Sequence, residues 1–368
     1  MKKIFLIILS TILLISSSNL FAKDIPVIVI APGKNIQSKS TVGTNVTVIS
    51  GDTIRSSSDN FLGNIIDGNS TSTNTFQMGG YGTNMGVQLR GLEKRYSTVY
   101  IDGVKMSDPS SPDNSFYFQH IMKDSIERVE VLKGNQSTLY GSNAIGGTIH
   151  IFTKKGKEGH RSTAKVSAGS NKTTNAYYSF DGANDKIDYY LGLNRFLTGG
   201  ISARNDDGES DQYRNESLTA NFGYTFNENL KIENSLRVRN TDLKYDAVAP
   251  SSTDLNDRSD DITGNYSLRI IQDAGKNNNT LSYNKLQTDR KTTETGNTKQ
   301  NYFGYRDAVN WTGTYNFDLD NRIVYGAEGE FDASRYIGDY APSQNGWNKY
   351  QFDKYTDESI VSQFFDYQ

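Results

Sequence analysis

From about residue 162 to the end of the chain, apolar and polar side chains alternate in a series of short segments. Leu218, Ala220 and Phe222, for example, are separated by Thr219 and Asn221. A period of two residues places the apolar side chains of a β-strand on one face and the polar ones on the other. The pattern predicts about ten strands, near residues 162–168, 175–181, 187–196, 217–226, 230–239, 263–271, 279–288, 309–317, 322–331 and 358–367.

The segments between these strands alternate in length. Short turns are expected near residues 184–185, 227–229, 273–276 and 318–321. Long polar loops are expected at residues 198–215, 241–261, 290–303 and 335–356. Outer-membrane β-barrels are built in this way, with short turns on one rim and long loops on the other. A soluble β-sandwich shows no such alternation, so we predict that this half of the chain is part of a transmembrane β-barrel.

Composition is consistent with a barrel and excludes several other classes of protein. Hydrophobic residues make up only 35% of the chain, yet 23 tyrosines and 17 phenylalanines are present, which suits half-polar strands with aromatic rims and also an extracellular β-sandwich. The absence of cysteine excludes a disulfide scaffold, a thiol nucleophile and a cysteine zinc site. No nucleophile–base set indicates an enzyme, and no basic stripe indicates nucleic-acid binding.

The first 22 residues have the pattern of a secretory signal peptide. Lys2 and Lys3 precede an apolar run from Ile4 to Ile15, and the small residue Ala22 provides a cleavage site. The apolar run is too short to be a good transmembrane anchor. We therefore expect export across an inner membrane, followed by removal of the leader.

Between the leader and the barrel segments lies a region of short strands and glycine-rich loops. Residues 126–153 are expected to form a strand, a tight loop and a second strand. The glycines of this loop allow close approaches that a Cβ atom would prevent. VQLRGL (87–92) and STVYIDGVKM (97–106) are two further strands, the second turning at Asp102 and Gly103, a pair typical of hairpins.

Four of these segments, taken in order, resemble the plug domain of TonB-dependent outer-membrane receptors. They are QLRG (88–91), VYIDGV (99–104), IERVEVLKG (126–134) and YGSNAIGGTIHI (140–151). The resemblance implies an all-β transmembrane barrel preceded by a small α+β plug domain. Because such transporters close with 22 strands, we expect the chain to hold about 10 of 22 and to be truncated at its C-terminal end.

The resemblance also implies a domain order and a partner. We expect a signal peptide at residues 1–22, a TonB box and linker at 23–34, the plug at 35–157 and the N-terminal part of the barrel at 158–368. The TonB box would be pulled by the periplasmic domain of TonB, driven by an inner-membrane complex, through β-strand addition; a plain N-terminal strand is the alternative. Its residues would be Asp24, Ile25, Pro26, Val27, Ile28, Val29, Ile30 and Ala31.

Charged side chains on the plug would need partners inside a barrel. A buried charge is costly unless it is paired, and a plug that moves under load is expected to use ion pairs with the wall. The resemblance implies that Arg90 and Arg128 meet barrel glutamates, for which Glu328 and Glu330 are the candidates. For Lys133 a solvent-facing position on a strand is an equally good interpretation.

Two polar loops of the plug are expected to face the outside. In the family such loops contact the ligand, and a plain surface loop is the alternative for each residue. The candidates for ligand contact are Tyr81, Asn84, Asp108, Phe116 and Tyr117.

Acidic loops of the barrel are similar to those of cobalamin receptors, in which carboxylates hold calcium. Clustered carboxylate oxygens suit a hard cation, although an ordinary solvated acidic loop is the alternative and no EF-hand spacing is present. The candidate ligands of a structural calcium ion are Asp206, Glu209, Asp211 and Asp246. No other cofactor is expected.

The resemblance implies a TonB-dependent receptor of the Gram-negative outer membrane that actively takes up a large, scarce ligand. Cobalamin is the ligand that the acidic loops favour, and a ferric siderophore is the first alternative. A passive porin or a non-functional barrel fragment is the alternative from another class. The expected partners are TonB, a small-molecule ligand and outer-membrane lipid, with no nucleic acid and no enzymatic activity.

Overall fold

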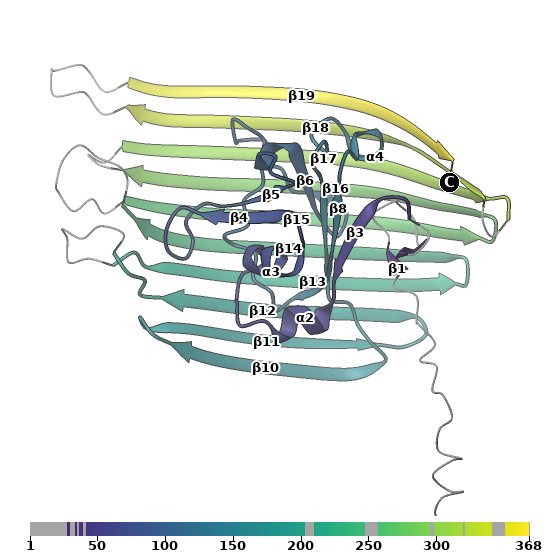
Figure 1. The fold of residues 1–368 in the computed structure, drawn as a ribbon, viewed down its shortest axis with the longest axis horizontal. Coiled ribbons are helices and arrows are strands. Elements are labelled where there is room, and N and C mark those ends of the chain that lie inside the picture. Colours follow the sequence, from purple (N-terminus) through teal and green to yellow (C-terminus); the bar gives the residue numbers. More distant parts are fainter. Residues whose placement is uncertain are drawn as a thin grey trace, which may run out of the picture.

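The computed structural model describes residues 28–29, 34, 37–39, 42–202, 210–246, 257–294, 298–318, 321–340 and 350–367. Two parts are visible in Figure 1: a small domain in purple and blue, and a broad sheet of long strands that runs from teal to yellow. The small domain lies against one face of the sheet. No helix among the described residues is long and apolar enough to cross a membrane.

The small domain is built on a five-stranded sheet in the order β3-β8-β9-β6-β7. These strands are β3 (Asn45–Ile49), β6 (Ser97–Ile101), β7 (Val104–Lys105), β8 (Ile126–Lys133) and β9 (Gly147–Thr153). All neighbours are antiparallel except β6 and β9. The turn between β6 and β7 has positive φ at both Asp102 (49°) and Gly103 (89°), which is the backbone that a primed hairpin turn requires.

Short helices and two further strand pairs complete the small domain. They are β1 (Ile28–Val29) with β2 (Gln37–Ser38), β4 (Thr73–Gln77) with β5 (Met85–Leu89), and α2 (Gly51–Ser56), α3 (Leu62–Asn69), η3 (Lys94–Tyr96) and α4 (Ser137–Tyr140). Helix α2 begins where the Ser50 hydroxyl accepts a hydrogen bond from the backbone N–H of Thr53 (3.2 Å), which is a standard N-cap. Helix α3 buries Leu62, Ile65 and Ile66.

The core of the small domain is apolar and closely packed. Its sheet contributes Val129, Val131, Ile149 and Ile151, all fully buried. At Gly147, where φ is 142°, an added Cβ atom would lie 2.1 Å from the carbonyl oxygen of Leu132 on the neighbouring strand. The expected tight packing of the glycine-rich segment is therefore present, because only glycine allows β8 and β9 to pair at this point.

The large sheet holds all ten strands that the alternation predicts, each paired antiparallel with the next in sequence. The expected fold class, a small α+β domain followed by a partial barrel wall, is confirmed. Strands β10 and β19 are the edges of the sheet among the described residues. The strands are β10 (Gly159–Gly169), β11 (Thr173–Ala183), β12 (Ile187–Thr198), β13 (Tyr213–Asn227), β14 (Leu230–Tyr245), β15 (Asp257–Ala274), β16 (Asn277–Glu294), β17 (Thr298–Asn316), β18 (Arg322–Tyr340) and β19 (Tyr350–Tyr367).

The strands are longer than expected, which shortens the connections. The loop expected at residues 290–303 is wrong for most of its length, because β16 continues to Glu294 and β17 begins at Thr298. Cross-strand pairing with each neighbour satisfies the backbone even where the sequence is polar. Short turns remain at one end of the sheet, at residues 184–186, 228–229 and 275–276, and the backbone N–H of Phe317 donates to the carbonyl oxygen of Asn321 between β17 and β18. Strand β1 lies toward this end (Figure 1).

The two faces of the large sheet reverse the burial pattern of a soluble protein. On β13, Thr219 and Asn221 point toward the small domain and are 2% and 6% exposed, whereas Phe222 on the other face is 45% exposed. The same contrast recurs along β14 and β17, where Leu236 and Trp311 are exposed. An exposed apolar face opposite a buried polar one is the arrangement of a strand that faces lipid outside and a polar lumen inside.

Candidate functional site: the seam between the small domain and the sheet

We call the seam the set of inward-facing side chains of β10–β19 together with the small-domain residues that they contact. Arg306 of β17 is fully buried in the seam. Its guanidinium pairs with Asp332 and, at 3.3 Å, with Glu330 on β18. It also donates to the carbonyl and hydroxyl oxygens of Ser107, each at 2.9 Å. Glu330 accepts a second bond from Lys105 of β7 (2.8 Å), so this cluster joins the small domain to two strands of the sheet.

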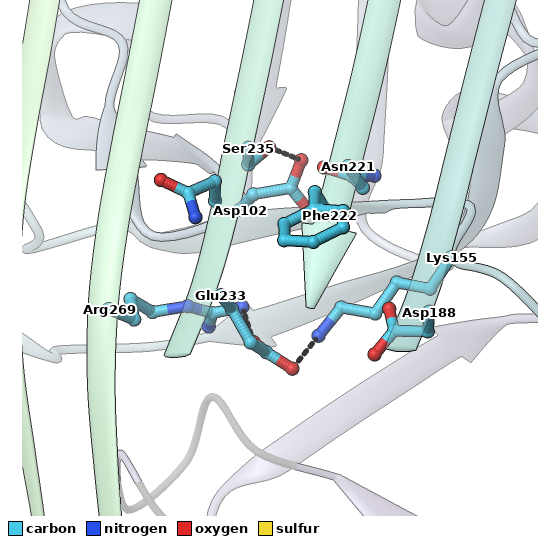
Figure 2. Close-up of a pocket in the computed structure, with 9 residues that line it drawn as sticks. Asp102, Lys155, Asp188, Asn221, Phe222, Glu233, Ser235 and Arg269 are labelled. Atoms are coloured by element: carbon cyan, nitrogen blue, oxygen red, sulfur yellow. Dashed lines mark hydrogen bonds and ion pairs between the residues drawn. The ribbon is translucent and has the colours of Figure 1, made fainter. Parts of the chain in front are cut away.

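A second polar cluster lies around Asp102 at the β6–β7 turn. Figure 2 shows its carboxylate directed at Ser235 of β14, whose hydroxyl donates to it at 3.1 Å. The other bonds to this carboxylate come from the backbone N–H (2.9 Å) and hydroxyl (2.6 Å) of Thr153. A charge-assisted network of this kind fixes the end of β9 against the sheet.

Glu233 forms ion pairs with three cations, of which Lys155 and Arg269 are drawn in Figure 2. It accepts from Lys155 (2.7 Å), Arg269 (2.5 Å) and Lys231 (3.0 Å). The cavity that this cluster shares with Asp102 has a volume of about 10 Å³. A space of that size holds no more than one water molecule, so this part of the seam is a junction and not a ligand site.

A much larger cavity, of about 440 Å³, lies between β6, β9 and the inner faces of β15–β18. Its small-domain wall is aromatic: His150 stacks on Tyr100 with ring centres 4.9 Å apart and an angle of 5°. Burial lowers the pKa of His150 to about 3, and the charge of Lys34 acts in the same direction. The carboxylates of Glu328 and Glu330 line the opposite wall. The volume is in the range of small-molecule sites.

On the β10–β13 side the small domain is held by amides and a carboxylate. Asp124 accepts from the side-chain amides of Asn194 (3.0 Å) and Asn175 (3.3 Å). Asn221 donates to the hydroxyl of Thr153 (2.7 Å) and to the carbonyl oxygen of Lys154 (2.6 Å). These bonds continue the polar seam across the sheet.

Two contacts across the seam are apolar. In one, Leu286 of β16 is buried in the core of the small domain. The other is an aromatic anchor made by Phe61, Met122, Phe196, Tyr213 and Leu243. The Tyr213 hydroxyl lies 2.7 Å from Nδ1 of His120 and accepts a bond from the Asn215 amide at 2.8 Å. Burial lowers the pKa of His120 to about 3, and nearby arginines add to the effect. The anchor buries aromatic surface from both parts of the molecule, so it is the part of the seam that resists separation most.

The expected partners of Arg90 and Arg128 are wrong. Arg128 donates to Glu130 on its own strand (2.9 Å) and lies 3.8 Å from the ring centre of Phe152. The two residues are two apart on β8 and share one face, so they pair locally. Arg90 is exposed in a left-handed turn (φ 55°) after β5, beside Gly134. The small-domain cation that reaches Glu330 is instead Lys105.

Lys133 is buried rather than solvent-facing. It is 4% exposed, and its ammonium group donates to the Thr71 hydroxyl at 3.2 Å.

The five residues expected to contact a ligand fall into two groups. Tyr81 and Asn84 are exposed, and Tyr81 also rests on the aromatic anchor, 5.5 Å from the ring centre of Phe61. Asp108 and Phe116 have other roles. Asp108 accepts from Thr288 (3.2 Å) and pairs with Arg290 (3.4 Å) across the seam, while Phe116 is 8% exposed within the core. Tyr117 is half-buried beneath the ammonium group of Lys94.

Several expected residues lie wholly or partly outside the described part of the chain. Of the TonB box, the structure describes Ile28 and Val29, which pair with β2; the other six residues and the leader at 1–22 lie outside. Asp206 and Glu209 also lie outside, while Asp211 is buried and Asp246 half-buried. Within the described ranges, no group of three or more His, Asp or Glu residues is placed to hold a metal ion.

The residues that sequence reasoning missed are Asp102, Lys105, Glu233 and Arg306. A signal was available for two of them. Glu233 and Arg306 are charged residues on the polar face of strongly alternating strands, and that face points inward. Nothing in the local pattern indicates which small-domain residue each would meet, because the partners are far away in the sequence.

Comparison with known proteins agrees with this architecture. The TonB-dependent receptor plug domain matches residues 38–148. The chain is 28% identical over 278 residues to the vitamin B12 transporter BtuB of Photobacterium profundum, covering 67% of this chain and 45% of that protein. It is 27% identical over 186 residues to the ferric enterobactin receptor PirA of Pseudomonas aeruginosa, covering 48% and 23%.

Solved structures show the same fold. The ferripyoverdine receptor of Pseudomonas aeruginosa superposes with a TM-score of 0.74 at 11% identity, covering 92% of this chain and 51% of that one. The copper transporter OprC gives a TM-score of 0.67 at 14% identity, covering 87% and 51%. The chain thus spans about half of these structures and less than half of the relatives named above. Residues 38–148 are therefore a plug domain of the TonB-dependent receptor type, seated through a polar seam on ten antiparallel strands, and the fold of the two parts together is that of the solved outer-membrane receptor.

Proposed function

We propose that the chain provides the plug and part of the wall of a receptor that takes up cobalamin actively across a Gram-negative outer membrane, with TonB as its energy-coupling partner. The observation that carries this proposal is the seam. Its apolar contacts are the aromatic anchor and Leu286 of β16, which is buried in the core of the small domain. The other contacts described above are hydrogen bonds and ion pairs, such as those of Arg306, Asp102 and Glu233. Polar contacts can be exchanged for water, so a plug held by them can move without exposing a hydrophobic core.

The distribution of contacts supports a direction for that movement. The aromatic anchor holds the plug to β12–β14, at Phe196, Tyr213 and Leu243, whereas the 440 Å³ cavity lies toward β15–β18. In our proposal the ligand binds at the outer loops, TonB pulls residues 24–31, and a passage opens on the cavity side, where a space of about 440 Å³ already separates the plug from the sheet.

Cobalamin is proposed as the ligand because several relatives, including those of Photobacterium profundum and Vibrio vulnificus, are vitamin B12 transporters. A ferric siderophore is the second candidate, which the relative PirA and the solved ferripyoverdine receptor favour. Titrating the purified full chain in detergent micelles with cyanocobalamin and with ferric siderophores separates the two. Tight siderophore binding without cobalamin binding would overturn the first choice.

The TonB role has its own test. Deleting residues 24–32 from the protein expressed in a strain that lacks its own receptor should abolish energy-dependent uptake while ligand binding persists. A passive porin would not respond to the deletion. Unchanged uptake would therefore contradict the proposed energy coupling and leave ligand identity untouched.

We also propose, from the acidic character of the loops that carry Asp206, Glu209, Asp211 and Asp246, that calcium orders the outer side of the receptor. Calcium should raise the thermal midpoint of the purified protein, and Asp211→Asn should reduce the increase. An equal response to magnesium would argue for general charge screening in place of a specific site.

A further inference from the structure

Arg237 is a buried cation on the inner face of β14 that forms no ion pair with any residue that the structure describes. It is 5% exposed and lies between Ser235, which bonds Asp102, and Arg239, which pairs with Asp261 at 2.5 Å. Within the described ranges, the guanidinium of Arg237 has neither an ion pair nor a hydrogen bond. Asp102 is the acid whose charge reaches it, but that carboxylate is already engaged by Thr153 and Ser235.

The polar atoms next to Arg237 are donors as well. Asn265 stands directly opposite it on β15, and the side-chain nitrogen Nδ2 of Asn265 is buried without an acceptor. Two residues along β14 on the same face, Nε of Arg239 is also buried without an acceptor, while its Nη2 donates to Asp261 and Thr263. Opposite residues of an antiparallel pair have Cβ atoms about 5 Å apart. The two nearest side chains on this face therefore offer Arg237 buried donors without acceptors, where buried polar atoms normally have partners.

The field in this part of the seam is positive. Arg237, Arg239 and Arg290 lie near His120 of the plug, and Asp261 is the acid whose charge opposes them there. Burial is the first cause of the low pKa of His120, and the three arginines lower it further. Of the two buried guanidinium groups on this strand, Arg239 is paired with Asp261 and Arg237 is not paired, and a buried charge without a partner is unfavourable unless a further anion is present.

We propose that a small inorganic anion of the phosphate or halide class binds in the seam between Arg237, Nδ2 of Asn265 and Nε of Arg239. A guanidinium fork, an amide and a lone N–H are the donors that proteins use for such ions. The ion balances the arginine pair and ties the plug-facing side of β14 to β15. The site concerns the resting seam and does not depend on which ligand the receptor transports.

The first test measures phosphate binding by the purified full chain in detergent micelles, through its thermal midpoint at constant ionic strength. The wild-type midpoint should rise with phosphate, and Arg237→Gln should weaken the apparent phosphate affinity by about tenfold or more. Arg335→Gln, which removes an arginine from an exposed pair with Asp353, is the control and should respond as the wild type does. Equal phosphate dependence in Arg237→Gln and the wild type overturns the proposal.

A second variant keeps the test decisive if Arg237→Gln fails to fold. Asn265→Asp replaces the amide that would donate to the anion with a carboxylate of nearly the same shape, which supplies a negative charge beside Arg237. It should raise the thermal midpoint in anion-poor buffer and abolish the response to phosphate. A lower midpoint with a wild-type phosphate response contradicts the site. Crystals grown with bromide should show an anomalous peak within hydrogen-bond distance of Arg237, and a map without that peak also contradicts it.

Discussion

At the scale of single residues, the seam tolerates the buried charges of Arg306, Asp102 and Glu233 because each has partners on other segments of the chain. Arg306 serves Asp332, Glu330 and Ser107 at once, so its five N–H donors meet both charge and backbone. The pairing expected for Arg90 and Arg128 failed for a local reason. Arg128 has Glu130 on the same face of its own strand, and a partner two residues away costs less conformational entropy to reach than one on the wall.

Replacing Arg306 with glutamine should be severely destabilising. The change leaves Asp332 without its guanidinium partner inside the seam, and removing one member of a buried ion pair costs about 3–5 kcal/mol of the free energy of unfolding. Urea unfolding of the full chain in micelles measures the loss. Arg335→Gln, at an exposed pair, should change the free energy little or not at all; equal losses in the two variants would mean that the Arg306 cluster is not buried.

Stability should fall in mild acid because His120 is buried as the neutral imidazole. Its pKa is about 3 in the folded protein, against an ordinary value near 6.5 when unfolded. Between these values the unfolded chain binds the additional proton, so stability is complete above about pH 6.5 and decreases as pH falls. At pH 5 the loss amounts to about 2 kcal/mol.

The control for this pH dependence is a second histidine. His120→Gln should reduce the decrease in unfolding free energy between pH 7 and 5 by about half, because His150 has the same low pKa and contributes a similar decrease. His160→Gln, at an exposed position on β10, should leave the decrease unchanged. The groups that face His120 are Tyr213, Arg237, Arg239, Arg290 and Asp261. A slope that is the same in all three proteins would place the titrating group elsewhere.

At the scale of elements, the alternation of apolar and polar residues and the residue types of the turns predicted most of the strands. The period-two pattern located all ten long strands, because lipid and lumen impose opposite solvents on the two faces of every strand. Strand ends were less predictable: β16 and β17 extend through a polar stretch that the pattern assigned to a loop. Backbone pairing with a neighbour extends a strand regardless of side-chain polarity, and that neighbour is unknown from the local sequence.

Two glycines of the plug motif should respond differently to alanine. Both have positive φ, but a Cβ atom at Gly147 would lie 2.1 Å from the Leu132 carbonyl oxygen, whereas at Gly141 it would meet nothing within 4 Å. Gly141→Ala should cost about 1–2 kcal/mol through backbone strain alone. Gly147→Ala should cost more than about 3 kcal/mol, because β8 and β9 must also separate. Urea unfolding and proteolysis of the plug provide the comparison, and equal costs would mean that β8 and β9 do not pair closely there.

At the scale of the whole molecule, the large sheet has an apolar face turned outward and a polar face turned to the plug. The aromatic anchor and several polar clusters hold the plug to the sheet, and a cavity of about 440 Å³ lies between the two. The candidate site is therefore a surface between two parts of the chain. Residues as far apart as Lys105 and Glu330 meet in it, which is why the sequence showed the two parts but not their contacts.

A lysine on the outward face should obstruct membrane insertion. Leu236 is 39% exposed in the middle of β14, and a lysine at the middle of the bilayer costs about 2–4 kcal/mol. Leu236→Lys should therefore fold into lipid vesicles less stably by that amount. Asn240→Lys, on the same face nearer the end of β14, should cost about 0–1 kcal/mol. In a soluble protein both substitutions would be nearly neutral, so two neutral results would contradict the lipid-facing assignment.

By itself the sequence determined the strands, the glycine turns and the division into plug and wall, because these follow from local periodicity and from backbone conformations that only certain residues adopt. The tertiary structure alone decided which charges meet. Arg306 donates to Ser107, Asp102 accepts from Ser235, and Arg237 lies opposite Asn265 on the neighbouring strand. The physical reason is that register and docking set these contacts, and both depend on the summed energy of many distant pairs, which no single stretch of the chain contains.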